Sequence, residues 1–135
     1  MIAFPRVIVT GGRDLTDAGL VAFGLDGIRR LVGDFLLVHG GARGADTLAN
    51  RWAVARGLPR PEIHKVDGSD WSRYRGYAGH RRNQAMVDAG ALLLVSFPGG
   101  NGTRDCTTRA LAAAIPVVKV ELRFGAPAAR LVVSP

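Results

Sequence analysis

Three glycine-rich segments of the chain carry residue types that bind phosphate groups. They are Gly11-Gly12-Arg13, Gly40-Gly41-Ala42-Arg43-Gly44 and Pro98-Gly99-Gly100-Asn101-Gly102-Thr103. Glycine lets backbone N–H groups approach a phosphate, and the N-terminus of a helix that follows such a loop favours negative charge. Two of the segments also supply an arginine, whose planar guanidinium suits phosphate. The alternative is that these glycines only form tight turns.

Arg82 is the second feature that points to an anionic ligand. It lies on one face of a predicted helix with four small or apolar residues, so that face is expected to point inward. These four are Ala78, Ala85, Met86 and Ala89. A buried cation near a helix N-terminus is costly without a partner. Arg82 should therefore meet a ligand anion, pair with Asp46 or Asp105, or extend to the rim of the helix.

Asp46 and Asp105 are each predicted in the first turn of a helix that follows a glycine-rich loop. A carboxylate there can cap the helix or interact with its dipole, and it can also lie beside a bound ribose. Thr103 can likewise cap its helix or donate its hydroxyl to a phosphate. His39, at the end of a strand, is expected to be a hydrogen-bonded residue at the edge of the core.

The segment from Arg51 to Arg82 is strongly basic, with eight basic and three acidic residues. Trp71, Tyr74 and Tyr77 alternate there with arginines. Aromatic rings between arginines can stack a base while the guanidinium groups hold phosphate. Equally, Trp71 can pin the loop to the core.

The composition limits the remaining classes of function. The chain has 135 residues, a net charge of +7 and one cysteine. This length fits a single domain, predicted over residues 1–135, with a core at about 6–120 and a tail at 121–135. No Cys/His cluster offers a zinc site, so neither a metal nor a cofactor is expected. No signal peptide or membrane span is recognisable, so we expect a cytoplasmic protein without membrane contact.

Apolar runs rich in β-branched residues alternate with alanine-rich helical stretches, which predicts how these side chains are positioned. Strands are predicted at residues 6–10, 35–38, 62–66, 91–97 and 116–120. The alternation predicts an α/β protein with a Rossmann-like, doubly wound, parallel five-stranded sheet of order 3-2-1-4-5. Ligands of such sheets bind at the carboxyl ends of strands 1 and 4, where the three loops would converge. In the tail, residues 131–133 are predicted to pair either at an edge of the sheet or with another subunit.

Together these motifs resemble the SLOG superfamily of nucleotide-binding Rossmann-like domains, in particular its YspA and cpYpsA-related branch. The resemblance runs from Val7 to about Val120. It is carried by four segments, residues 9–13, 39–46, 78–86 and 97–103. The resemblance implies a nucleotide-derived ligand at the carboxyl edge of the sheet, with Asn83 among the residues that bind it. Neither a Walker A motif nor an intact G-x-G-x-x-G is present, which disfavours a standard nucleoside triphosphatase or an NAD dehydrogenase.

The LOG phosphoribohydrolases, which cut the N-glycosidic bond of cytokinin nucleoside monophosphates, are a more distant resemblance. Residues 98–105 are similar to their P-G-G-x-G-T-x-x-E motif, and residues 82–86 match R-K-x-x-M except at Asn83. By this resemblance Arg82 would orient the sugar. Asp105, the nearest carboxylate to the family's Glu, would stabilise or attack the ribose centre.

The Gly-Ala-Arg-Gly-x-Asp segment at residues 41–46 is also similar to the DNA-processing protein of natural transformation, which binds single-stranded DNA. The leading prediction is a domain that binds a nucleotide or a nucleotide-derived small molecule, as a sensor or processing domain. Phosphoribohydrolase activity and single-stranded DNA binding are the alternatives. A homodimer is expected from the LOG resemblance and the apolar tail.

Overall fold

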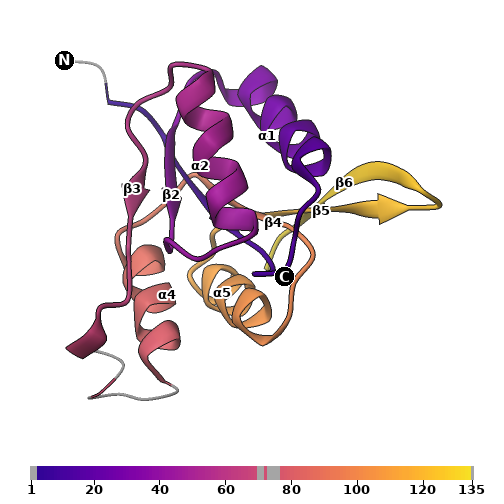
Figure 1. Cartoon of the computed structure of the whole chain (residues 1–135). Helices are drawn as coiled ribbons and strands as arrows, with labels where there is room; N and C mark the ends of the chain where they lie inside the picture. Colours follow the sequence, from indigo (N-terminus) through magenta and orange to yellow (C-terminus); the bar gives the residue numbers. More distant parts are fainter. Residues whose placement is uncertain (1–2, 70–71, 73–76, 135) are drawn as a thin grey trace.

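The computed structural model describes residues 3–69, residue 72 and residues 77–134. Within these residues, four helices accompany a six-stranded sheet of order β3-β2-β1-β4-β5-β6 (Figure 1). The strands are β1 (Arg6–Thr10), β2 (Leu36–His39), β3 (Glu62–Ile63), β4 (Leu93–Ser96), β5 (Val117–Arg123) and β6 (Ala126–Val132). The helices are α1 (Ala18–Val32), α2 (Ala45–Ala55), α4 (Ala78–Asp88) and α5 (Asn101–Ala112).

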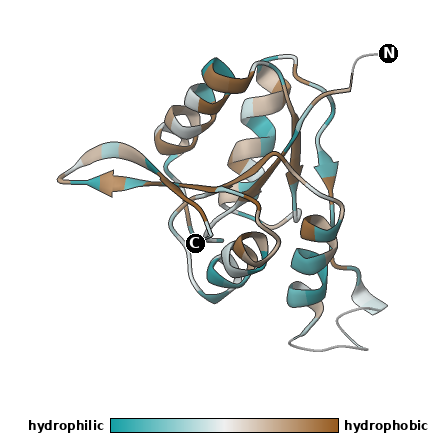
Figure 2. Cartoon of the chain, turned by 180° about the vertical axis from the view of Figure 1, so that it is seen from behind, coloured by the Kyte–Doolittle hydropathy of each residue, from teal (hydrophilic) through white to brown (hydrophobic). Residues whose placement is uncertain are grey.

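Two hydrophobic clusters lie on opposite faces of the sheet, because successive residues of a strand point to opposite sides. Val7 and Val9 of β1 belong to the cluster that α1 and α2 cover. Ile8 belongs to the cluster that contains Met86 of α4 and Cys106 of α5. Helices therefore cover both faces of the sheet, which explains the nearly continuous apolar runs of its central strands (Figures 1 and 2).

The sheet has six strands, which corrects the predicted five. The first five are parallel in the predicted order, and β6 is antiparallel to β5, from the pair Val117–Val132 to the pair Arg123–Ala126. Phe124 and Gly125 form the turn, with φ of 52° and 78°, as two-residue hairpins require. The tail thus pairs at an edge of its own sheet, and the hairpin extends beyond the helices in Figure 2.

The third strand is shorter than the predicted residues 62–66. The last backbone hydrogen bond between β2 and β3 runs from the His64 N–H to the carbonyl oxygen of His39, where β2 ends. Beyond this point β3 has no neighbouring strand to pair with.

An ion pair between Arg6 of β1 and Glu62 of β3 connects these two strands across the sheet. The hydrogen bonds from Arg6 and His64 lower the pKa of Glu62 to about 2.

No helix in the described ranges has the length and apolar character needed to cross a membrane.

Candidate functional site

A cavity of about 270 Å³ opens at the carboxyl edge of the sheet, where β1 and β4 end. Its walls come from residues 9–13 after β1, Gly40 and Ala42 after β2, and residues 100–103 at the start of α5. Asp46 of α2 and three residues of α4 complete it, and these three are Arg82, Asn83 and Met86. The chain crossover between β1 and β4 thus creates the ligand position that doubly wound sheets use.

The second glycine-rich loop uses its backbone N–H groups internally. Gly40 and Ala42 both donate to one carboxylate oxygen of Asp46, over 3.1 and 3.2 Å. Gly41 donates to Nδ1 of His39, whose Nε2 lies 2.8 Å from the side-chain oxygen of Asn50. This loop is therefore fixed by its own chain and does not present these three N–H groups to a ligand.

Glycine is needed where the loops pack against one another. Gly44 has a φ of +79°, and a Cβ there would lie 2.2 Å from the carbonyl oxygen of Gly12. Gly12 in turn donates its N–H to the carbonyl oxygen of Pro98, over 2.8 Å. A Cβ on Gly99 would lie 2.1 Å from Oγ1 of Thr103. These glycines bring three loops into contact, so their first role is packing.

The N-terminus of α5 differs because it stays open to the cavity. Gly100 is its N-cap and provides no side-chain hydrogen bond. The first helical hydrogen bond runs from the Arg104 N–H to the carbonyl oxygen of Gly100, so the N–H groups of residues 101–103 precede the helical ladder. A Cβ at Gly100 or Gly102 would meet no atom within 4 Å. This helix end has the geometry of an anion-binding site.

Arg82 lies beside this helix end, on the wall that α4 provides. Its Nη1 donates to the carbonyl oxygen of Gly40 over 2.7 Å, and its Nε donates to the side-chain oxygen of Asn83 over 2.9 Å. Among the described residues it forms no ion pair with Asp46 or Asp105, and its Nη2 has no hydrogen-bond partner. The guanidinium is therefore held in place with one edge left for a ligand.

The inward face of α4 departs from the prediction. Ala78 and Met86 are buried as expected, but Ala85 and Ala89 are exposed. Asn83 is buried instead, at 4 % exposure, because its side chain binds α5. Its amide donates to Gly102 O and to the Asp105 carboxylate, over 3.3 and 3.0 Å. Arg82 thus lies at the boundary of the buried face, where it reaches the cavity.

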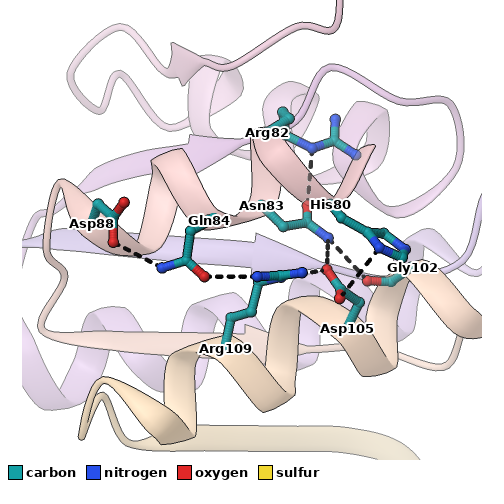
Figure 3. A network of polar contacts seen from close by, with 8 residues as sticks. All are labelled: His80, Arg82, Asn83, Gln84, Asp88, Gly102, Asp105 and Arg109. Carbon is teal, nitrogen blue, oxygen red and sulfur yellow. Dashed lines mark hydrogen bonds and ion pairs between the residues drawn. The ribbon is translucent and has the colours of Figure 1, made fainter. Parts of the chain in front are cut away.

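Asp105 belongs to a polar network between α4 and α5 (Figure 3). Its carboxylate accepts hydrogen bonds from Asn83 and from Nε of Arg109, the latter over 2.9 Å. Burial alone would raise the pKa of Asp105, but these bonds and the charge of Arg109 lower it. Because α5 begins at Asn101, Asp105 lies in the second turn, not in the predicted first turn, and it does not line the cavity.

Asp46 is the carboxylate that lines the cavity. It lies in the first turn of α2, as predicted, and its residue exposure is only 6 %. Burial raises the pKa of Asp46, although the backbone N–H groups of Ala42 and Gly40 and the charges of His39 and Arg82 act in the opposite direction. Asp46 therefore both fixes the second loop and faces the space that a ligand would occupy.

Most of the predicted site residues meet at this cavity. Those predicted to bind the ligand that line it are Gly11, Gly12, Arg13, Gly40, Asp46, Asn83, Gly100, Asn101, Gly102 and Thr103. Arg82, predicted to orient the sugar, lines it as well, whereas Gly44 is the N-cap of α2. Gly41 and Arg43 line a neighbouring cavity, and Pro98 and Gly99 line a separate one beside β5. Trp71 lies outside the described residues. Sequence reasoning missed Lys65, which follows β3 at the same edge; because it falls inside the strand predicted at residues 62–66, the sequence carried no signal for it.

Comparison with known proteins shows to which family the chain belongs. Residues 5–74, which include β1, β2, β3 and the first two loops, match the model of the YspA, cpYpsA-related SLOG family. The chain belongs to this family. This SLOG chain is also similar to the Gene 61 protein of Mycobacterium phage D29, with 41 % identity over 120 residues. The match covers 84 % of this chain and 94 % of the phage protein. No solved structure matches the chain.

Proposed function

We propose that this SLOG chain binds a nucleotide or a nucleotide-derived small molecule in the cavity between β1, β4, α4 and α5. The observation that carries the proposal is the open N-terminus of α5, which meets Arg82 at one cavity. Membership of the SLOG family supports a nucleotide-related ligand. The role is that of a sensor or processing domain.

The phosphate of the ligand is assigned to the N-terminus of α5. The N–H groups of residues 101–103 and the helix dipole favour an anion there, and the free edge of Arg82 adds a charge-assisted hydrogen bond. Arg13, on the opposite loop, adds a second cation to the same cavity. The sugar would then lie toward Asp46, whose carboxylate can accept a hydrogen bond from a ribose hydroxyl.

Binding has more support than hydrolysis through Asp105. A carboxylate that stabilises or attacks a ribose centre must reach it. The Asp105 carboxylate is instead held between Arg109 and Asn83, with its side chain 16 % exposed, and it does not line the cavity. Phosphoribohydrolase activity and single-stranded DNA binding therefore stay predictions from sequence.

Calorimetry tests the proposal with a panel of nucleoside mono- and diphosphates, ADP-ribose and cyclic nucleotides. We expect at least one to bind tighter than about millimolar, and Arg82→Gln to weaken it at least about tenfold because a charge-assisted contact is lost. Arg30→Gln, at an exposed position of α1, is the matched control and should leave the affinity unchanged. Absence of binding across the panel would refute the proposal.

A further inference from the structure

A second cavity of about 320 Å³ adjoins the proposed nucleotide site and is lined by basic side chains. The two cavities share Arg13, Gly40, Ala42 and Arg82, so they adjoin at the ends of β1 and β2. Arg43 and Lys65 line only the second of the two. Its lining, as far as the structure describes it, includes four cations and no carboxylate.

Within the described residues this charge is balanced in part: Arg82 interacts with the carboxylate of Asp46, and Arg43 with that of Asp14. Arg13 and Lys65 form no ion pair there. Nη2 of Arg43 lies 3.3 Å from Oδ1 of Asp14, but the two side chains are 76 % and 95 % exposed. An ion pair exposed to this extent is weak and is screened by salt. The cavity therefore concentrates positive charge that is available to an anion.

The folding of the second loop explains why this cavity offers side chains and not backbone N–H groups. The N–H groups of residues 40–42 are bound to Asp46 and His39. Lys65, which follows β3, lies against the same loop: a Cβ on Gly41 would be 3.3 Å from Cγ of Lys65. The rigid loop thus supports the Lys65 stem, and Lys65 and Arg43 both reach this cavity.

We propose that the ligand carries two phosphate groups, the second bound by Arg43 and Lys65. This inference rests on the proposed function and specifies its ligand class. The first phosphate lies at the N-terminus of α5, and Arg13 and Arg82, which line both cavities, lie between the two groups. The ligand is a diphosphate- or bisphosphate-bearing nucleotide. A cavity of about 300 Å³ is at the small end of the range for ligand sites. A nucleotide with two phosphate groups would therefore occupy both cavities.

The test uses the whole chain and compares nucleotides that differ in one phosphate. The probes are AMP, ADP and adenosine 3′,5′-bisphosphate, with the guanosine series in parallel, measured by calorimetry. In the wild type, one two-phosphate nucleotide should bind at least about tenfold tighter than its monophosphate, because a second charge-assisted contact forms. The variant Arg43→Gln/Lys65→Gln should abolish this advantage and weaken the monophosphate by less than about threefold.

The matched control is Arg123→Gln/Arg130→Gln, which removes two exposed charges from the β5–β6 hairpin. It should preserve the advantage of the two-phosphate nucleotide. Equal affinity for one and two phosphates in the wild type, or an equal loss for both in the variant, would overturn the second subsite and leave nucleotide binding standing. Failure of every nucleotide to bind would overturn the proposed function itself. Tighter binding of a 5′-phosphorylated thymidine oligonucleotide of about eight nucleotides, weakened by the same variant, would overturn the small-ligand assignment in favour of a strand.

Discussion

Two helices begin at the same edge of the sheet, after similar glycine-rich loops, yet their N-termini are used differently. Both α2 and α5 have a glycine N-cap without a side-chain cap, Gly44 and Gly100. At α2, the Ala45 N–H donates to the carbonyl oxygen of Gly12, and Asp46 places a carboxylate in the first turn. At α5, the first turn contains no acidic residue and lines the cavity.

The difference shows that a glycine-rich loop before a helix does not by itself make a phosphate site. At α2 the chain itself supplies the acceptors that satisfy the loop, namely Asp46, His39 and the Gly12 carbonyl. At α5 residues 101–103, whose N–H groups precede the helical ladder, line a cavity that also contains Arg82. The first helix end holds the loops together, and the second is the one we assign to the ligand.

The largest expected effect compares the two N-caps directly. Gly44→Ala should lower the free energy of unfolding by about 3 kcal/mol, because position 44 has a positive φ and its Cβ would overlap Gly12. Gly100→Ala should lower it by only about 1 kcal/mol, because no atom lies within 4 Å of the new Cβ and the loss is that of alanine at an N-cap. Urea denaturation measures both. Equal losses would mean that the two helix ends do not differ in packing.

The next prediction concerns the charge at the open helix end. Gly102→Asp should keep or raise the melting temperature, because an acidic residue stabilises the first turn of a helix. The same change should weaken nucleotide binding at least about tenfold, or about 1.4 kcal/mol, by repelling phosphate. Gly102→Asn adds a side chain of similar size without charge and should weaken binding less. Equal losses for Asp and Asn would show that volume and not charge controls the site.

The smallest predicted effects are changes in stability with pH that arise from Asp46 and Asp105. Their pKa values are shifted in opposite directions from the ordinary 3.8. For Asp46 the folded pKa is raised, so wild type gains stability relative to Asp46→Asn as the pH falls through that value toward 3.8. For Asp105 the folded pKa is lowered. Wild type therefore loses stability relative to Asp105→Asn as the pH falls from 3.8 through that lower value.

Denaturation of the three proteins across the acid range checks these signs. At neutral pH we expect Asp105→Asn to cost about 1 kcal/mol, through the weakened contacts to Arg109 and Asn83. Nucleotide affinity should not change in this variant, since Asp105 is outside the cavity. The same pH trend for both variants would contradict the assigned environments, and a large loss of affinity in Asp105→Asn would favour a role at the ligand.

Sequence patterns predicted the parallel part of the fold because its signals are local. Apolar β-branched runs between helical stretches indicate buried parallel strands, and the order 3-2-1-4-5 is confirmed for these five. For the sixth strand the sequence indicates only residues 131–133, as an edge strand or a contact with another subunit, because the rest of β6 has no continuous apolar run. The same patterns predicted which loops would gather at the carboxyl edge, since parallel strands end together.

Sequence could not predict which acceptors bind the backbone N–H groups of each loop. Asp46 accepts two of these N–H groups only because of where α2 begins relative to β2. The position of Asp105 depends on α5 starting at Asn101, which moves the carboxylate one turn away from the loop. Lys65 reaches the second cavity only because β3 pairs with β2 and ends beside its loop. Each of these facts arises from packing between distant segments.

In the proposed site α5, and not α2, presents its N-terminus to an anion. Backbone amide NMR of the whole chain, titrated with inorganic phosphate at low salt, tests it most directly. We predict that the largest chemical-shift changes occur at Asn101, Gly102 and Thr103, with small changes at residues 45–47, and that Gly102→Asp abolishes them. Largest changes at residues 45–47, or no change at residues 101–103, would contradict the account.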